Sequence, residues 1–242
     1  MKKELTAKLH SIETFGAVDG PGIRTVFFLQ GCPARCRYCH NPDTWDMNNG
    51  AAGVLTAEEA VRKAKRGRPY YGPSGGVTFS GGEPLIHGEF LAEAIDALHE
   101  EGIHCAIDTS GTYFDGKSEE AIEKADLVLL DIKHTDPVEF KKLTGRDMDA
   151  LFRVIEAVNE TDTSVWIRQV IVPGLNDTEE YVRGLKEFIK AVNKVEKVEL
   201  LGYHSMARTK YEKLGISYPL EGVKDMDGTR LKELQEIVEN PV

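Results

Sequence analysis

The chain has 242 residues, 41% of them hydrophobic, which is enough to bury the core of one large α/β domain or two small ones. Its 40 acidic and 30 basic residues give a formal net charge of −10, and the absence of a basic stripe argues against a nucleic-acid-binding protein. No run approaches the roughly 18 apolar residues of a membrane span, and residues 1–10 lack the apolar segment of a secretory signal. We therefore expect a cytoplasmic protein that binds neither nucleic acid nor membrane.

Strand-like runs alternate with amphipathic, helix-like stretches along the whole chain. The predicted strands are rich in Val, Ile, Leu and Phe and span residues 23–30, 76–80, 104–108, 127–133, 165–172 and 198–203. The first predicted helix begins at Thr56, where Glu59 completes a capping-box pattern. The other predicted helices span residues 89–101, 118–124, 148–159, 178–193 and 229–239. Strands that alternate with helices indicate βαβ units and a parallel sheet.

Six such units predict an open barrel. A complete eight-fold barrel typically needs about 250 residues, and this chain must also house an N-terminal extension and a cysteine-rich loop. We therefore expect one domain over residues 1–242, with an α/β fold of the partial, TIM-like (β/α)6 barrel type and a short N-terminal extension. A doubly wound sheet is the alternative architecture.

Three of the four cysteines follow the first predicted strand with the spacing C-x3-C-x2-C: Cys32, Cys36 and Cys39. A disulfide framework would spread its cysteines along a small secreted domain, so this clustering favours a metal centre. A four-iron cluster bound by three thiolates keeps one iron open, and a substrate can bind there. The alternatives are zinc, with His40 as a fourth ligand, and a weaker one, a redox pair at 36 and 39. Cys105 lies inside an apolar strand and is expected to be a buried core residue.

The strings around these cysteines resemble those of a known family. C-x3-C-x2-C after a strand is the hallmark of radical S-adenosylmethionine (radical SAM) enzymes, and the longer strings resemble the activating enzymes that install glycyl radicals. The resemblance covers nearly the whole chain, through the segments DGPG at 19–22, HN at 40–41, DTWD at 43–46, SGGE at 80–83, DTSG at 108–111, LDIK at 130–133, VWIR at 165–168 and YH at 203–204.

This resemblance implies the partial barrel that the strand pattern predicts independently, and it also implies a reaction. An electron from reduced flavodoxin or ferredoxin enters a [4Fe-4S] cluster, and S-adenosylmethionine is split to methionine and a 5′-deoxyadenosyl radical. That radical removes a hydrogen atom from one glycine of a partner glycyl-radical enzyme, for which we expect pyruvate formate-lyase and thus a role in anaerobic metabolism. The alternatives are another glycyl-radical enzyme or a small-molecule substrate.

Polar residues at the C-terminal ends of the predicted strands complete the expected site, because βα-barrels build their sites at that rim. The resemblance implies that S-adenosylmethionine contacts Tyr38, Cys39, His40, Gly81, Gly82, Glu83, Asp108, Asp131, Ile132, Lys133, Arg168 and His204. It further implies a monovalent cation on Asp108, Thr109 and Asp131, and a contact between Asp19 and the glycine segment of the partner.

Several of these residues also have purely structural interpretations. The two glycines suit a simple βα turn. Lys133 is costly to bury without an anion, and Asp131 lies two residues before it on the same strand face. Residues 108–109 could cap a helix or bond within a loop, and His204 could be a structural histidine. Arg168 could bind an acidic wall residue instead of a ligand.

Overall fold

The computed structural model describes residues 4–48 and 52–239. Within these ranges one sheet has the strand order β3-β1-β2-β4-β5-β6-β7-β8. The strands are β1 (Thr6–Gly16), β2 (Arg24–Leu29), β3 (Val54–Thr56), β4 (Gly76–Gly81), β5 (His104–Thr109), β6 (Leu127–Asp131), β7 (Ser164–Ile171) and β8 (Val195–Gly202). The helices are α1 (Ala57–Tyr71), α2 (Gly88–Glu100), α3 (Gly116–Lys124), α4 (Pro137–Thr144), α5 (Asp149–Glu160), α6 (Glu179–Ile189), α7 (Arg208–Leu214) and α8 (Gly228–Glu239), with short 3-10 helices η1 (Pro42–Thr44), η2 (Pro84–His87) and η3 (Ser205–Ala207).

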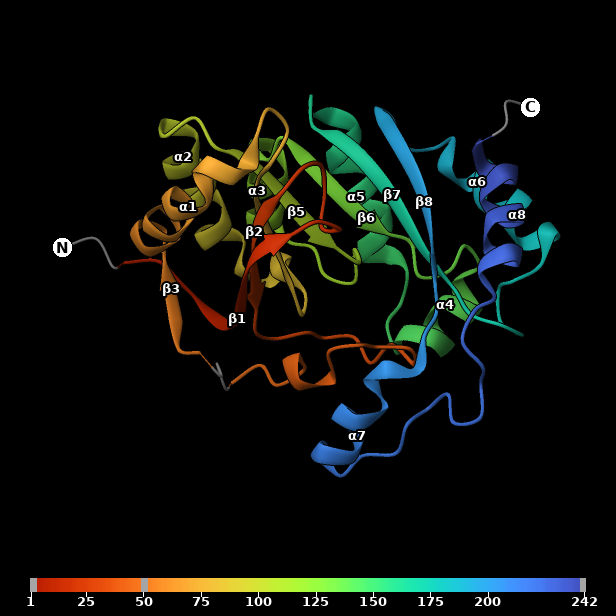
Figure 1. Ribbon diagram of the computed structural model, residues 1–242. Coiled ribbons are helices and arrows are strands. Elements are labelled where there is room, and N and C mark those ends of the chain that lie inside the picture. The colour runs from red at the N-terminus through yellow and green to blue at the C-terminus, as the bar shows by residue number, and fades with distance from the viewer. Residues whose placement is uncertain (1–3, 49–51, 240–242) are drawn as a thin grey trace.

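Strands β2 and β4 to β8 pair in parallel and curve into an open barrel with helices along its outer face (Figure 1). These strands match the six predicted ones to within a few residues, so the predicted partial barrel is confirmed. Parallel pairing places their C-terminal ends along one rim. In particular, Leu29 of β2 lies opposite Gly81 of β4, and Asp131 of β6 lies opposite Arg168 of β7.

The N-terminal extension joins this sheet instead of standing apart. Strand β1 pairs antiparallel with β2, and β3 pairs antiparallel with β1. Thr56 ends β3 and caps α1, because its hydroxyl accepts the backbone N–H of Glu59 at 3.1 Å, as the capping pattern predicts. At the opposite edge of the sheet, the Gln235 side chain accepts from the Leu200 N–H and donates to the Val198 carbonyl, so α8 covers part of β8's open edge.

Two helices were not predicted, and one ends earlier than expected. Helix α4 starts with Asp136, whose carboxylate accepts from the backbone of residues 138 and 139, and Pro137 follows it. It stops at Gly145, which has a left-handed φ of +72°. These are recognisable start and stop signals that the sequence pattern contained. Helix α7 is only seven residues long and has no side-chain N-cap, although it stops at Gly215 with a left-handed φ of +68°. Helix α6 ends at Ile189 rather than at residue 193.

The core lies between the sheet and its outer helices. Phe27 of β2 and Phe79 of β4 stack with ring centroids 5.6 Å apart, and both are fully buried with Leu91 and Ile95 of α2. Each such side chain contributes about 1.5–3 kcal/mol by leaving water. This packing holds the parallel strands rigidly, so their C-terminal rim can position functional groups.

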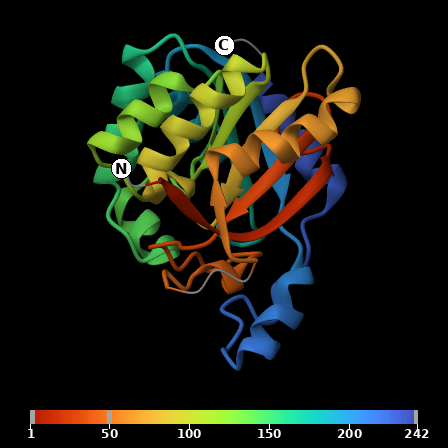
Figure 2. The ribbon, with the colours of Figure 1, turned by 90° about the vertical axis from the view of Figure 1, so that its left-hand side faces the viewer.

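Beyond β8 the chain returns to the loop that follows β2. Helix α7 lies beneath the sheet, next to that loop, in both views (Figures 1 and 2). Among residues 4–48 and 52–239, none of the helices combines the length and the apolar character needed to cross a membrane.

Candidate active site

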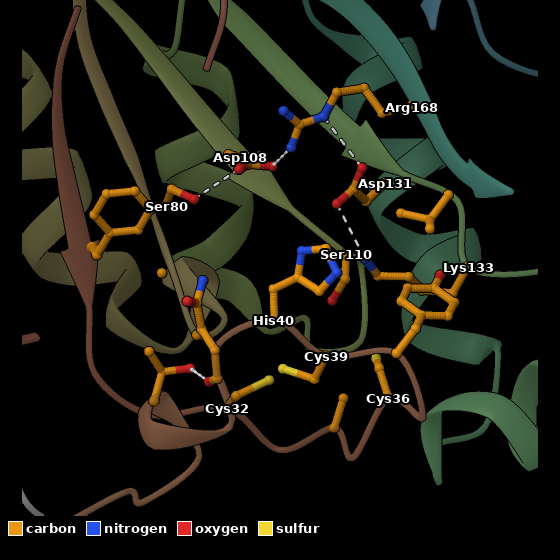
Figure 3. A pocket seen from close by; sticks show the side chains of 18 of the residues that line it. Cys32, Cys36, Cys39, His40, Ser80, Asp108, Ser110, Asp131, Lys133 and Arg168 are labelled. Atoms are coloured by element: carbon orange, nitrogen blue, oxygen red, sulfur yellow. Dashed lines mark hydrogen bonds and ion pairs between the residues drawn. The ribbon is translucent and has the colours of Figure 1, made fainter. Parts of the chain in front are cut away.

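The loop after β2 brings three thiols to one cavity. Gly31 turns the chain out of β2 with φ +106°, a conformation that glycine adopts without strain. Cys32, Cys36 and Cys39 then pack in one cluster and line a cavity of about 300 Å³ (Figure 3). Cys105 is fully buried in β5, and its prediction as a core residue is confirmed.

Helix α4 holds the first half of this cysteine loop. The last turn of a helix leaves carbonyl groups without partners inside the helix. Here the Leu143 carbonyl accepts the N–H of Arg37 at 2.9 Å, and the Thr144 carbonyl accepts the N–H of Arg35 at 2.7 Å. The Arg35 guanidinium donates to the Cys32 carbonyl at 2.8 Å. The backbone on both sides of Cys36 is therefore held by a helix end, and the Cys32 carbonyl is held by the Arg35 side chain.

The three thiols have the chemistry of a cluster site. Burial raises the pKa of Cys36 to about 12 and also raises the pKa values of Cys32 and Cys39. Thiolates in such surroundings need a positive charge beside them, and a metal centre supplies it. Three thiolates suit a four-iron cluster with one iron free for a substrate.

A single zinc ion fits less well. Tetrahedral zinc with Zn–S distances of about 2.3 Å brings its sulfur ligands to roughly 3.8 Å from one another. Among the described residues, the ligand atoms of His99, Cys105 and Asp126 lie within 4.8 Å of one another. The three sulfur atoms of the cysteine loop do not meet this limit. The ring of His40 also extends away from the labelled sulfur atoms (Figure 3). The wider spacing of the loop thiols favours the iron cluster.

The group of His99, Cys105 and Asp126 lies at the opposite end of the strands and is bonded within the protein. Oδ2 of Asp126 accepts the backbone N–H of Cys105 at 2.7 Å and lies 2.9 Å from Nε2 of His99. The Cys105 thiol donates to the Ile103 carbonyl at 3.4 Å. These hydrogen bonds within the protein account for the arrangement of His99, Cys105 and Asp126 as a structural one.

A charged network crosses the cavity from β5 to the end of β6. The Arg168 guanidinium binds Asp108 through Nη2 and Asp131 through Nε, the latter at 3.2 Å. The other oxygen of Asp131 accepts from Lys133 Nζ at 3.0 Å, and Ser80 Oγ donates to Asp108 at 2.7 Å. All five side chains line the cavity (Figure 3).

Asp131, Lys133 and Arg168 keep their charges although they are largely buried. Burial alone would raise the pKa of Asp131, but Arg168 and Lys133 hold it below its usual range. Burial also opposes the charges of Arg168 and Lys133, yet the neighbouring carboxylates raise both pKa values. Two cations and two carboxylates therefore balance, and a ligand entering the cavity meets charges of both signs.

The glycine pair at the end of β4 fits close backbone contact. A Cβ on Gly81 would lie 2.3 Å from the Leu29 nitrogen, and one on Gly82 would lie 2.2 Å from the Gly31 carbonyl oxygen. Both glycines also line the cavity. No side chain fits at residues 81 and 82, because the end of β2 passes directly alongside them. Their backbone lines the cavity without a side chain and can contact a ligand there.

Glu83, which was predicted to contact the ligand, lies behind the cavity wall. Its side chain is fully buried and does not line the cavity. Oε1 accepts from the Thr109 hydroxyl at 2.6 Å, and Oε2 accepts from the Ser110 hydroxyl at 2.7 Å and from its N–H at 3.1 Å. Burial raises the Glu83 pKa, and these donors partly offset the rise. Glu83 thus joins the ends of β4 and β5.

Each of the three residues predicted to bind a monovalent cation bonds to a group of the protein. The Thr109 hydroxyl points to Glu83, and the guanidinium of Arg168 lies between Asp108 and Asp131. Arg168 therefore contributes positive charge beside both carboxylates, and the monovalent cation stays a prediction. Ile132, predicted as a ligand contact, is fully buried in the hydrophobic core.

Tyr38 and His40 line the part of the cavity beyond Cys39, and His204, which does not line the cavity, lies against His40. The rings of His40 and His204 lie 4.0 Å apart, and burial together with His204 lowers the pKa of His40 to about 4. His40 Nε2, His204 Nδ1 and the Tyr38 hydroxyl are buried and have no hydrogen-bond partner among the described residues. Aromatic rings with unused polar atoms suit a flat, polar ligand such as a nucleoside base.

Asp19 reaches the cavity from the loop before β2. The Thr78 hydroxyl donates to the Asp19 carbonyl at 2.7 Å, and the fully buried Arg24 donates to Thr78 at 2.6 Å. Burial and nearby Asp108 raise the pKa of Asp19 to about 6. The side chain can therefore exist as a neutral acid or as a carboxylate near physiological pH.

The structure adds cavity residues that the sequence analysis did not single out for the cavity. These are Phe28, Ala34, Asn41, Thr44, Trp45, Ser80, Ser110, Val170 and Leu201. Ser80, Ser110 and Val170 follow the barrel rule, because they lie at the C-terminal ends of β4, β5 and β7. That positional signal was present in the sequence, whereas the direction of each side chain was not.

Comparison with known proteins agrees with this geometry. The model of the radical SAM superfamily matches residues 26–205. The pyruvate formate-lyase-activating enzyme of Clostridium pasteurianum is 51% identical over 229 residues, covering 94% of this chain and 95% of that protein. The corresponding enzyme of Streptococcus mutans is 40% identical over 242 residues, covering 98% and 92%.

Solved structures show the same fold. A domain of the pyruvate-formate lyase-activating enzyme from Bacteroides vulgatus has a TM-score of 0.55 at 26% identity, covering 68% of this chain and 92% of that one. Streptococcus suis SuiB bound to its precursor peptide SuiA has a TM-score of 0.64 at 20% identity, covering 86% and 43%. Because the superfamily match spans most of the chain and one curated relative shares half of its residues, this chain belongs to the radical SAM superfamily and, within it, to the family of pyruvate formate-lyase-activating enzymes.

Proposed function

We propose that this chain activates pyruvate formate-lyase by reductive cleavage of S-adenosylmethionine and removal of a hydrogen atom from one glycine of that enzyme. The observation that carries the proposal is the convergence of three thiols and a charged network on one cavity. The name shared by relatives at 51% and 40% identity supports the choice of partner. Another glycyl-radical enzyme or a small molecule is the alternative substrate.

Cys32, Cys36 and Cys39 are the residues that hold the iron–sulfur cluster. When bound, a [4Fe-4S] cluster with one iron free of thiolates binds S-adenosylmethionine and supplies the electron that splits it to methionine and a 5′-deoxyadenosyl radical. The task of the polypeptide is to hold both groups in fixed positions and to keep water away from the radical.

The charged network binds the amino-acid end of S-adenosylmethionine. Lys133 and Arg168 attract its carboxylate. The backbone of Gly81 and Gly82 faces the amino group, because neither residue has a side chain to keep the ligand away. Asp131 keeps both cations oriented and offsets their charge.

The two histidines receive the nucleoside end of the same molecule. His40 and His204 offer ring nitrogens without protein partners, and the Tyr38 ring lies 5.6 Å from Lys133 Nζ. Burial keeps His40 neutral, which suits contact with an uncharged base.

Asp19 contacts the glycine segment of the partner. A carboxyl with a pKa of about 6 can accept a hydrogen bond from a peptide N–H or donate one to a peptide carbonyl. The reductant is reduced flavodoxin or ferredoxin. A cytoplasmic location fits this assignment, because thiols stay reduced there.

The test is an anaerobic activation assay. Protein reconstituted with iron and sulfide, reduced and mixed with S-adenosylmethionine and pyruvate formate-lyase, should produce 5′-deoxyadenosine and a glycyl-radical signal in electron paramagnetic resonance. Omission of S-adenosylmethionine should abolish both products.

The outcomes separate the alternatives. Deoxyadenosine without a radical on pyruvate formate-lyase, but with one on another glycyl-radical enzyme, would reassign the partner. Deoxyadenosine without a radical on any glycyl-radical enzyme would point to a small-molecule substrate and end the activase assignment.

A further inference from the structure

The second half of the cysteine loop is held by α7, a different element from the one that holds the first half. The Tyr211 hydroxyl donates to the carbonyl of Cys39 at 3.2 Å. One residue earlier, Lys210 Nζ donates to Asn41 Oδ1 at 2.7 Å and lies 3.3 Å from Asp43 Oδ1. Consecutive residues of one short helix therefore contact Cys39 itself and two positions that follow it, Asn41 and Asp43.

Tyr211 is itself rigidly placed. Its side chain is almost fully buried, and its ring lies edge-on to Trp45 at 5.9 Å and to Tyr218 at 4.9 Å. The hydroxyl groups of Tyr218 and Tyr203 are 2.6 Å apart, which ties this aromatic cluster to the end of β8. A buried hydroxyl on a packed ring loses little entropy on bonding, so it can fix the position of its acceptor.

The peptide groups around Cys39 are consequently held on both sides. The Cys39 N–H donates to the Cys36 carbonyl at 3.0 Å, and its carbonyl accepts from Tyr211. Such a pair of bonds determines the direction in which the Cys39 side chain leaves the backbone. The following residue, His40, lies against His204, which is next to Tyr203.

This support lies outside the part of the chain that the superfamily shares. The radical SAM model ends at residue 205, whereas α7 begins at Arg208. Helix α4, which holds the first half of the loop, lies inside the matched range. The shared domain therefore contains the support for Cys32 and Cys36, and the segment after β8 contributes the support for Cys39.

We propose that Tyr211 is a positioning residue for the cluster: its hydroxyl holds the Cys39 peptide so that the third thiolate is ready to bind iron. The inference rests on the proposed function in one respect, namely that Cys39 is a cluster ligand. It predicts that loss of this hydroxyl loosens the Cys39 segment and speeds iron loss, while the rest of the fold is unchanged.

The first test measures iron release from the anaerobic, reconstituted holoenzyme in an excess of an iron chelator. Tyr211→Phe keeps the packed ring and removes one hydrogen bond, so iron release should be about fivefold faster than in the wild type. Tyr113→Phe is the matched control, because its hydroxyl bonds to Asp115 at 2.8 Å, away from the cysteine loop. Its release rate should equal that of the wild type.

The second test needs neither iron nor activity. Hydrogen–deuterium exchange on iron-free protein should show faster exchange in Tyr211→Phe for peptides covering residues 38–45, and unchanged exchange for β5. Wild-type exchange and wild-type iron release in Tyr211→Phe would overturn the proposal. If Tyr211→Leu alone releases iron faster, ring packing is responsible and the role of the hydroxyl is rejected.

These readouts stay separate from the activation assay. If the protein binds iron but does not activate any partner, the proposed function fails while the role of Tyr211 can still be measured. If the protein binds no iron at all, the exchange experiment still decides whether the hydroxyl orders the Cys39 segment.

Discussion

Arg168 donates its Nε–H to Asp131 at 3.2 Å, and the two residues are register partners on the adjacent parallel strands β7 and β6. The same guanidinium also binds Asp108 on β5. One side chain thus ties three strands together at the rim of the barrel. Removing one member of such a buried network is costly, because its partners remain charged without compensation. The network therefore stabilises the rim and prepares it for a charged ligand.

We expect Arg168→Gln to weaken both the fold and the binding of S-adenosylmethionine. The variant leaves two buried carboxylates with Lys133 alone, so the free energy of unfolding should fall by about 3 kcal/mol. Urea unfolding and calorimetric titration with S-adenosylmethionine measure the two effects. Arg183→Gln, at an exposed residue of α6, should change neither. Wild-type stability in Arg168→Gln would contradict the role of this network.

Cys36→Ala should abolish the brown colour and the bound iron of anaerobically prepared protein. Two thiolates cannot replace the three-point attachment that the loop provides. Cys105→Ala serves as the matched control, because its fully buried thiol belongs to the core. It should keep its iron and lose about 1–2 kcal/mol of stability through the small cavity left behind. Iron and sulfide analysis tests both variants. A full complement of iron in Cys36→Ala would reject the ligand assignment.

The titration of Asp19 should be visible in the pH dependence of stability. Burial, with Asp108 nearby, raises its folded pKa to about 6 from 3.8. A carboxyl with a raised folded pKa contributes stability that is fully present below the unfolded pKa and is lost as the pH rises through about 6. Asp19→Asn removes this titration. The unfolding free energy of the wild type relative to the variant should therefore fall by about 1–2 kcal/mol between pH 4 and 7, allowing for solvent screening.

A control variant should remove a carboxylate that does not act on the pKa of Asp19. Arg168 and Arg24 act against the rise, and Glu13 adds to it. Glu156→Gln, at an exposed position of α5, removes a carboxylate outside this group. Its difference from the wild type should stay nearly constant over the same pH range, and a flat difference for Asp19→Asn as well would contradict the assignment.

Glu83→Gln should affect the fold more than the ligand. Its carboxylate accepts bonds from Thr109 and Ser110, and an amide would place donors opposite donors. We expect a loss of about 2 kcal/mol in unfolding free energy. Because Glu83 does not line the cavity, the Kd for S-adenosylmethionine should rise less than in Lys133→Met, as calorimetry can measure. A large rise in Kd with unchanged stability would show that Glu83 contacts the ligand directly.

Much of the fold and of the site could be predicted from local patterns in the sequence. The parallel strands were predictable because each is a short apolar run, and the cysteine loop was predictable because three thiols crowd into eight positions. The placement of Asp108 and Lys133 at the cavity followed from the rule that parallel strands end on one rim, whereas Arg168 lies inside its strand and was predicted from the family resemblance. Helix α4 was missed although Asp136, Pro137 and Gly145 mark its ends.

The directions of the side chains at the rim could not be predicted in this way. Glu83 and Ser80 both lie at the end of β4, yet Ser80 lines the cavity and Glu83 turns behind it to bond with Thr109 and Ser110. The place of Arg168 between two carboxylates depends on the register of β5, β6 and β7 together. Such outcomes require the positions of neighbouring strands, which no local pattern contains.

The amino-acid sequence by itself determined the open parallel barrel, the loop with three closely spaced thiols and the rim of polar residues, because periodicity and spacing are local properties of a chain. Only the tertiary structure decided which polar groups meet in the cavity and which support it from behind. Tyr211 and Cys39 are 172 positions apart, and their bond exists because the chain after β8 packs back against the cysteine loop. Contacts of that kind depend on how packed elements bring distant residues together.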